Sequence, residues 1–159
     1  MHPWLSYQNL VDGPVASVSS PGHVWPDFAL GRASPDNLIP KNTTALTVLQ
    51  EVIKDLPYQS FQSMSFRIPT ATVTSGIVNL QVSSSININD LHKEFRKNPN
   101  LEVITENLVS SDFKGAAFGA SIDTRWTELS GGNLRIIAWY DNEFGYSSQI
   151  IRLSEFILG

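Results

Sequence analysis

The chain has 159 residues, a formal net charge of -4, no cysteine and 42% hydrophobic residues. This length suits one domain with a single core, and the lack of cysteine excludes disulfide scaffolds, cysteine-based zinc sites and thiol catalysis by this chain. Lysine and arginine are scattered, and no basic run, leader-like start or apolar stretch of ~18 residues is found. We therefore expect a soluble, cytoplasmic protein that binds neither nucleic acid nor a membrane.

The first predicted feature is a long irregular segment, residues 13–40, which holds five of the nine prolines. A loop of this length is usually functional or disordered. Its Val, Trp and Phe residues indicate that it packs against another surface. We therefore expect residues 1–159 to form one domain that contains this loop.

A helix is expected after the loop, because Asn42 or Thr43 can cap a segment that runs to Pro57. Its apolar residues recur with the helical period, so one face should pack on a core. These apolar residues are Leu46, Leu49, Val52, Ile53 and Leu56.

Two strands should follow. Residues 61–68 alternate between apolar and polar side chains, which places Ser65 and Arg67 on the outer, polar side. The residues predicted to face the core are Met64, Phe66 and Ile68, then Val78, Leu80 and Val82.

Asn87 or Asn89 is expected to open a short helix, in which Leu91 and Phe95 lie four residues apart and share one face. The sequence NPN at 98–100 should end it.

Strands are predicted at 101–109, 116–127 and 133–140, with the turn SGGN joining the last two, and a helix at 144–158. Strands outnumber helices, and the hairpin signals favour antiparallel pairing. The sequence therefore predicts an α+β domain with a mixed, largely antiparallel sheet and helices on one face.

Three residues could carry chemistry, and each also has an ordinary structural interpretation. His2 could act as a general base, or be a solvated terminal residue. Thr43 could help a helix start to bind phosphate, or simply cap that helix. Arg67 could pair with an anion or face water. No histidine stands at metal-ligand spacing, so we predict no metal site.

The stretch WYDNEFGY at 139–146 is the most specific. Asn142 follows a buried strand and offers an amide donor and acceptor, while Tyr146 offers a flat face one helical turn later. Such a pair could hold a planar amide ligand. The same residues could also form a capped helix with aromatics in the core, namely Trp139, Tyr140, Phe144 and Tyr146, and the two interpretations are compatible.

The chain resembles the C-terminal half of glyceraldehyde-3-phosphate dehydrogenase. WYDNEFGYS at 139–147 is similar to the signature near the C-terminus of that family. Four other segments match the family in the same order along the chain: HPWLSYQNLVDGP at 2–14, NLIPKNTTA at 37–45, FRIPT at 66–70 and SSDF at 110–113.

The resemblance implies a role for each candidate. Asn142 would hydrogen-bond the nicotinamide carboxamide of NAD or NADP, and Tyr146 would lie beside the nicotinamide ring. His2 would activate the nucleophilic cysteine, and Thr43 and Arg67 would bind phosphate groups. The partners implied are a phosphorylated aldehyde, inorganic phosphate and further copies of the protein in a homo-oligomer, a tetramer in the family.

The sequence also departs from the family. The nucleophilic cysteine, which precedes the histidine in the family, is missing, and so is a glycine-rich dinucleotide-binding segment. Leu5 and Tyr7 replace hydroxyl or acidic residues that contribute to substrate-phosphate binding in the family. We therefore expect the N-terminal dinucleotide-binding domain to be absent from this chain and the chain alone to be inactive.

Two functions follow. The chain is expected to be the catalytic domain of an NAD(P)-dependent phosphorylating aldehyde dehydrogenase of glycolysis or gluconeogenesis. The alternative is a non-catalytic oligomerisation or interaction module on the same scaffold.

Overall fold

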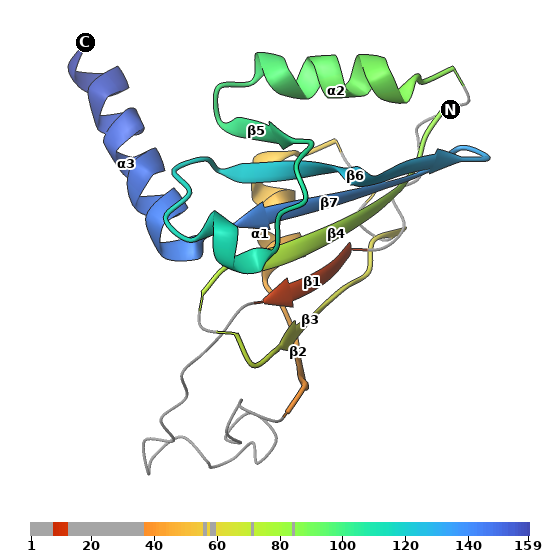
Figure 1. The fold of residues 1–159 in the computed structure, drawn as a ribbon, viewed down its shortest axis with the longest axis horizontal. Helices are drawn as coiled ribbons and strands as arrows, with labels where there is room; N and C mark the ends of the chain where they lie inside the picture. The colour runs from red at the N-terminus through yellow and green to blue at the C-terminus, as the bar shows by residue number, and fades with distance from the viewer. Residues whose placement is uncertain (1–7, 13–36, 56, 58–59, 71, 84) are drawn as a thin grey trace.

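A computed structural model describes residues 8–12, 37–55, 57, 60–70, 72–83 and 85–159. Within these residues, seven strands form one sheet in the order β2-β3-β1-β4-β7-β6-β5 (Figure 1). The strands are β1 (Gln8–Asp12), β2 (Ile39–Lys41), β3 (Ser63–Arg67), β4 (Thr74–Gln81), β5 (Leu101–Ile104), β6 (Ala120–Ser130) and β7 (Asn133–Tyr140). The helices are α1 (Ala45–Val52), α2 (Ile88–Lys97) and α3 (Asn142–Leu158), with the short 3₁₀ helix η2 (Ser110–Phe113).

The sheet is mixed and largely antiparallel, as predicted. Among the pairings of the described strands, β1 with β3 and β5 with β6 are parallel, whereas the other four are antiparallel. The β6–β7 hairpin turns at Gly131 and Gly132, which have positive φ angles of 58° and 80°. Two consecutive residues in this conformation favour glycine, because other side chains are strained there.

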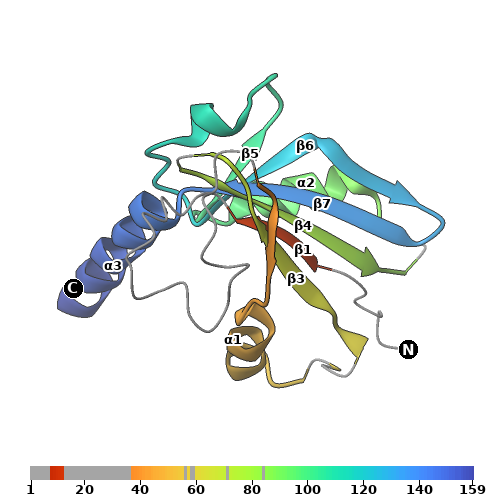
Figure 2. The same cartoon turned by 90° about the horizontal axis from the view of Figure 1, so that it is seen from below.

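Helix α2 packs on one face of the sheet. Its Leu91 and Phe95 contact a cluster built around Ile122, Leu134 and Ile136 of the neighbouring strands. The helix begins after Asn87, whose Oδ1 accepts a hydrogen bond of 2.8 Å from the Asn89 N–H. Figures 1 and 2 show α1 on the same side of the sheet, which confirms the predicted α+β arrangement.

The orientation predicted for β3 is wrong. Ser65 is fully buried, whereas Met64 is 38% exposed. The register explains this result: Ser65 and Gly76 both lie opposite Leu10, so Ser65 shares the face of the sheet on which α2 packs. Alternation fixes which residues share a face, but not which face the rest of the chain covers.

Other boundaries differ from the predictions as well. The strand predicted at 101–109 ends at Ile104, because the chain then turns toward η2. The predicted loop at 13–40 ends in the short strand β2, and residues 13–36 lie outside the described part. Strand β1 was not predicted.

Helix α1 starts at Ala45, with Thr44 at its N-cap position, rather than at Asn42 or Thr43. Its predicted packing face is also only partly covered, since Val52 is 73% exposed and the helix has no buried residue.

Helix α3 extends away from the end of the sheet (Figure 1). It covers the predicted segment 144–158, but its apolar side chains are exposed: Ile150 to 47%, Leu153 to 57% and Ile157 to 71%. The described part of the chain therefore leaves these apolar side chains exposed.

Candidate functional site

Residues far apart in the sequence meet at one end of the sheet. Arg67 is the last residue of β3 and pairs with Asp12, the last residue of β1. On the other side of β1, β4 begins at Thr74, which pairs with Tyr140 at the end of β7. Asn142 follows directly as the first residue of α3. β3, β1 and β7 end at this level and β4 begins there, so Arg67 and Asn142 lie at the same end of the sheet.

The sheet also sets the distance between these two positions. β3 and β7 are separated by three strand spacings, because β1 and β4 lie between them. At about 4.8 Å per spacing, their backbones are roughly 14 Å apart. One ligand that contacts both Arg67 and Asn142 must therefore be extended.

Asn142 is exposed, and its side chain is oriented by the sheet. Its Nδ2 donates a hydrogen bond of 3.4 Å to Oγ1 of Thr74, which is 1% exposed. Since Nδ2 is the donor, the amide oxygen Oδ1 is left to accept. An amide fixed in this way can bind a second planar amide.

Tyr146 lies four residues after Asn142 on α3, so both side chains lie on the same side of the helix. It is 69% exposed. The predicted juxtaposition of an amide and an aromatic ring is therefore present. The aromatics of this stretch were also predicted to lie in the core. That prediction is wrong for Tyr146 and for Phe144, which is 51% exposed.

Asp141 makes the turn between β7 and α3. Its Oδ1 accepts hydrogen bonds from the backbone N–H groups of Glu143, at 3.1 Å, and Phe144, at 3.0 Å. Burial alone would raise the pKa of Asp141, but these bonds and one from the Gly115 N–H hold that pKa below its ordinary value. The carboxylate is therefore the stable form at neutral pH.

Thr43 lies just before α1, and its Oγ1 accepts a hydrogen bond of 3.2 Å from the Ala45 N–H. This bond forms a local turn one residue before the N-cap Thr44, so Thr43 supports the start of α1 without capping it. Lys41 pairs with Ser65, two residues before Arg67 along β3, and Thr43 lies two residues beyond Lys41. Thr43 therefore lies beyond one end of β2, whereas Arg67 pairs with Ile39 at the other end of that strand.

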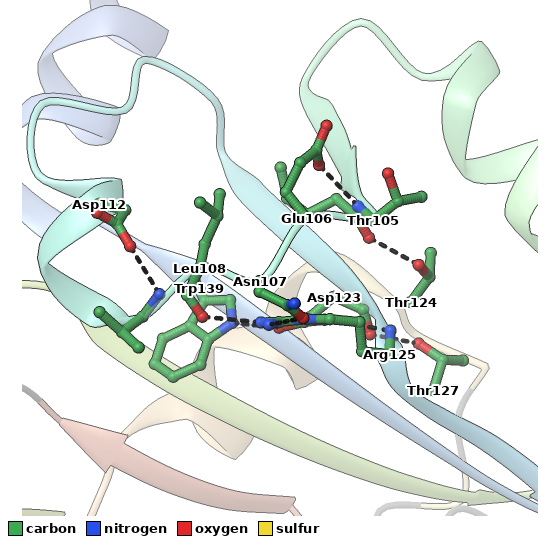
Figure 3. Close-up of polar contacts among 12 residues, drawn as sticks. Thr105, Glu106, Asn107, Leu108, Asp112, Asp123, Thr124, Arg125, Thr127 and Trp139 are labelled. Carbon is green, nitrogen blue, oxygen red and sulfur yellow. Dashed lines mark hydrogen bonds and ion pairs between the residues drawn. The ribbon is translucent and has the colours of Figure 1, made fainter.

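A buried ion pair, which we did not predict, lies on the opposite face of the sheet from α2 (Figure 3). Asp123 is fully buried and accepts hydrogen bonds from the guanidinium of Arg125 and, at 3.2 Å, from the indole N–H of Trp139. Arg125 also donates to the Leu108 carbonyl at 2.8 Å, which ties the segment before η2 to the sheet.

Burial alone would raise the pKa of Asp123, but the hydrogen bonds from Arg125 and Trp139 outweigh it and lower the pKa. The spacing in SIDTRW could have indicated the pair, because residues two apart in a strand share a face.

Comparison with known proteins identifies the family. The family described as glyceraldehyde 3-phosphate dehydrogenase, C-terminal domain, matches residues 11–142. The chain belongs to this family. It is 30% identical over 164 residues to glyceraldehyde-3-phosphate dehydrogenase of Glossina morsitans morsitans, which covers 99% of this chain and 46% of that protein. It is 33% identical over 141 residues to glyceraldehyde-3-phosphate dehydrogenase 2 of Synechocystis, covering 82% of this chain and 41% of that protein.

The chain thus spans about half the length of the curated relatives that it matches. The glyceraldehyde-3-phosphate dehydrogenase C-terminal domain predicted from the sequence is confirmed as the family of this chain.

Of the residues that the resemblance singled out, the structure describes Asn142, Tyr146, Thr43 and Arg67. It brings Asn142, Tyr146 and Arg67 to one end of the sheet and leaves Thr43 farther along it. His2 lies outside the described residues, as do Leu5 and Tyr7.

In the part of the chain that the structure describes, no three His, Cys, Asp or Glu side chains are grouped to hold a metal ion. Among the same residues, no helix is long and apolar enough to cross a membrane.

Proposed function

We propose that this chain is the catalytic domain of a glyceraldehyde-3-phosphate dehydrogenase-like enzyme, which oxidises and phosphorylates an aldehyde with NAD or NADP. The main observation in support is that Arg67 and Asn142 lie at the same end of the sheet, in a domain that belongs to this family. A cationic group and an oriented amide, on strands whose backbones are roughly 14 Å apart, suit a phosphorylated substrate next to a nicotinamide.

The side chains of α3 fit the carboxamide end of a nicotinamide. Asn142 is exposed, and its Nδ2 is directed by Thr74, so its amide oxygen can accept a hydrogen bond from the carboxamide. Tyr146 presents an exposed ring on the same side of the helix. When bound, the nicotinamide accepts a hydride from the substrate; these two residues bind and orient it.

Arg67 and Thr43 are proposed to bind anions. A guanidinium gives charge-assisted, paired hydrogen bonds to a phosphate, and Thr43 supplies a hydroxyl beside the start of α1. Thr43 lies beyond one end of β2, and Arg67 pairs with Ile39 at the other end. We therefore assign them to two phosphate positions, one for the phosphorylated aldehyde and one for inorganic phosphate.

His2 is proposed to take the proton of the nucleophilic thiol and to return it during turnover. The chain has no cysteine, so the thiol must come from outside these 159 residues. The aldehyde cannot form a thiohemiacetal with this chain alone. We therefore propose that the chain by itself is inactive and acts together with a dinucleotide-binding domain, in a cytoplasmic homo-oligomer.

A second candidate is a non-catalytic oligomerisation or interaction module. The apolar side chains of α3 favour it, because Phe156 is 84% exposed and Leu158 is 85% exposed in the described domain. Ligand binding separates the two candidates, since an interaction module has no need of the phosphate and nicotinamide sites.

The test is a nuclear magnetic resonance titration of the 159-residue chain with inorganic phosphate and, separately, with nicotinamide mononucleotide. The enzyme proposal predicts that phosphate shifts the Arg67 signals and that the nucleotide shifts the Asn142 side-chain amide and the Tyr146 ring. Arg96, on the exposed side of α2, serves as the internal reference. Shifts of equal size at Arg67 and Arg96 would indicate unspecific binding and favour the interaction module.

A further inference from the structure

The segment Gly115–Gly119 and helix α3 contact each other closely at the start of that helix. The Gly115 N–H donates a hydrogen bond of 2.9 Å to Oδ2 of Asp141, which is 7% exposed. Asp141 is 26 residues away in the sequence and immediately precedes Asn142. The other carboxylate oxygen of Asp141 caps α3. One side chain therefore fixes both the start of the helix and its distance from this segment.

A second contact lies one helical turn later, at Gly145, which is buried. A Cβ added there would lie 2.9 Å from the Phe118 carbonyl oxygen and 3.7 Å from that of Ala116. The first distance is shorter than a Cβ atom tolerates, and the opposing atom belongs to the backbone. Glycine at this position lets the helix approach the segment directly.

A third contact holds the next turns of α3. The Arg152 guanidinium lies 5.9 Å from the centre of the Phe118 ring. Its Nη1 donates a hydrogen bond of 3.0 Å to Oδ1 of Asn100. Since most of α3 is exposed, these contacts, which extend from Asp141 to Arg152, hold its direction.

From this geometry we propose that Asp141 is a positioning residue for Asn142. Its bond to Gly115 holds the first turn of α3 where the Asn142 amide reaches Thr74. A capping residue without the second oxygen would start the helix equally well but would leave its first turn free to shift. The inference rests on the proposed function in one respect: the proposed function supplies the ligand of the Asn142 amide.

The test compares Asp141→Ser with Asn87→Ala in the 159-residue chain. Serine is also a good N-cap residue, so Asp141→Ser keeps the cap and loses the bond to Gly115. Asn87→Ala removes the cap of α2, at a distance from Asn142, and controls for a general loss of stability. The readouts are hydrogen exchange at the Gly115 amide and the side-chain amide signals of Asn142.

We expect Asp141→Ser to accelerate exchange at Gly115 at least tenfold and to move the Asn142 side-chain signals toward those of an unstructured chain. Asn87→Ala should leave both unchanged. Unaltered Asn142 signals in Asp141→Ser would overturn the inference, whatever the chain binds.

A measurement on the unmodified chain keeps the inference testable if the variant does not fold. The Gly115 amide should exchange through the same opening as the Glu143 and Phe144 amides, because all three donate to Asp141. Exchange at Gly115 that is more than tenfold faster than at the other two would overturn the inference.

The role in cofactor binding is tested separately in the polypeptide that the complete reading frame encodes. There, Asp141→Ser should raise the KM for NAD about tenfold and change kcat by less than threefold. If the Asn142 signals move but the KM does not, the positioning of Asn142 by Asp141 is supported, and the assignment of Asn142 to the nicotinamide is the part that fails.

Discussion

The indole N–H of Trp139 on β7 donates a hydrogen bond of 3.2 Å to Oδ2 of Asp123, on the neighbouring strand β6. The Trp139 ring also makes an apolar contact. It stacks on the ring of Phe113 in η2, with ring centroids 5.4 Å apart and an interplanar angle of 6°. Trp139 is thus held from two elements just before the chain reaches Asp141 and Asn142. The ion pair of Asp123 and Arg125 supports the same region of the fold.

Arg125→Met is expected to lower the free energy of unfolding more than the loss of a surface ion pair does, because it leaves the buried Asp123 carboxylate without its charged partner. The control is Arg135→Met. Arg135 pairs with Glu128, and these side chains are 41% and 61% exposed, so that loss should be below about 1 kcal/mol. Urea unfolding measures both. Equal losses of unfolding free energy would show that the Asp123–Arg125 pair stabilises the fold no more than the exposed pair does.

Stability should fall in acid because of Asp123 and Asp141. The folded-state pKa of each is lowered, so each contributes stability that is present above the unfolded-state pKa of about 3.9. That stability is lost as the pH falls through the folded-state values. The unfolding free energy of Asp141→Asn should therefore depend less on pH below about pH 4 than that of the unmodified chain. Parallel pH profiles of the two proteins would contradict this.

Arg67→Gln should weaken the binding of inorganic phosphate about tenfold or more, because charge-assisted hydrogen bonds are lost. Thr43→Val should have a smaller effect, since it removes one neutral hydroxyl, and Thr43→Ser should have almost none. Isothermal titration calorimetry measures the affinities. Arg96→Gln, which removes an exposed cation from α2, is the matched control and should bind as the unmodified chain does.

Asn142→Ala should raise the KM for NAD about tenfold in the polypeptide of the complete reading frame, through loss of the hydrogen bond proposed between its amide and the nicotinamide carboxamide. Tyr146→Phe keeps the ring and should change little, whereas Tyr146→Ala should cost about 1 kcal/mol of binding. Steady-state kinetics give both constants. An Asn142→Ala enzyme with the original KM would remove Asn142 from the cofactor site.

His2→Asn should slow turnover by ~100-fold or more in the same polypeptide, because asparagine keeps a similar size but cannot carry the proton. An unaltered rate would assign His2 to an ordinary surface role.

Much of the fold could be predicted from the sequence. Helix α2 was expected from Asn87, Leu91 and Phe95, and the β6–β7 hairpin from its paired glycines, because these signals are local. The burial of Ser65 could not be predicted, since it depends on the face that α2 covers. Strand β1 could not be predicted either, because it pairs with β3 and β4. The residues of these two strands lie more than fifty positions away in the sequence.

The candidate site was predicted in part. Asn142 and Tyr146 stood out because an amide and an aromatic ring follow a buried strand at helical spacing. That Arg67 would reach the same end of the sheet requires the strand order, which local patterns do not contain. The bond from Gly115 to Asp141 was likewise hidden, because a backbone N–H leaves no mark on the sequence.

The most direct test of the central claim is the rate of NADH formation by the polypeptide of the complete reading frame, given glyceraldehyde 3-phosphate and NAD, with and without inorganic phosphate. We predict NADH formation that depends on phosphate, and none from the 159-residue chain alone. A folded complete polypeptide that forms no NADH under either condition would contradict the assignment as a catalytic domain and leave the interaction module as the better account.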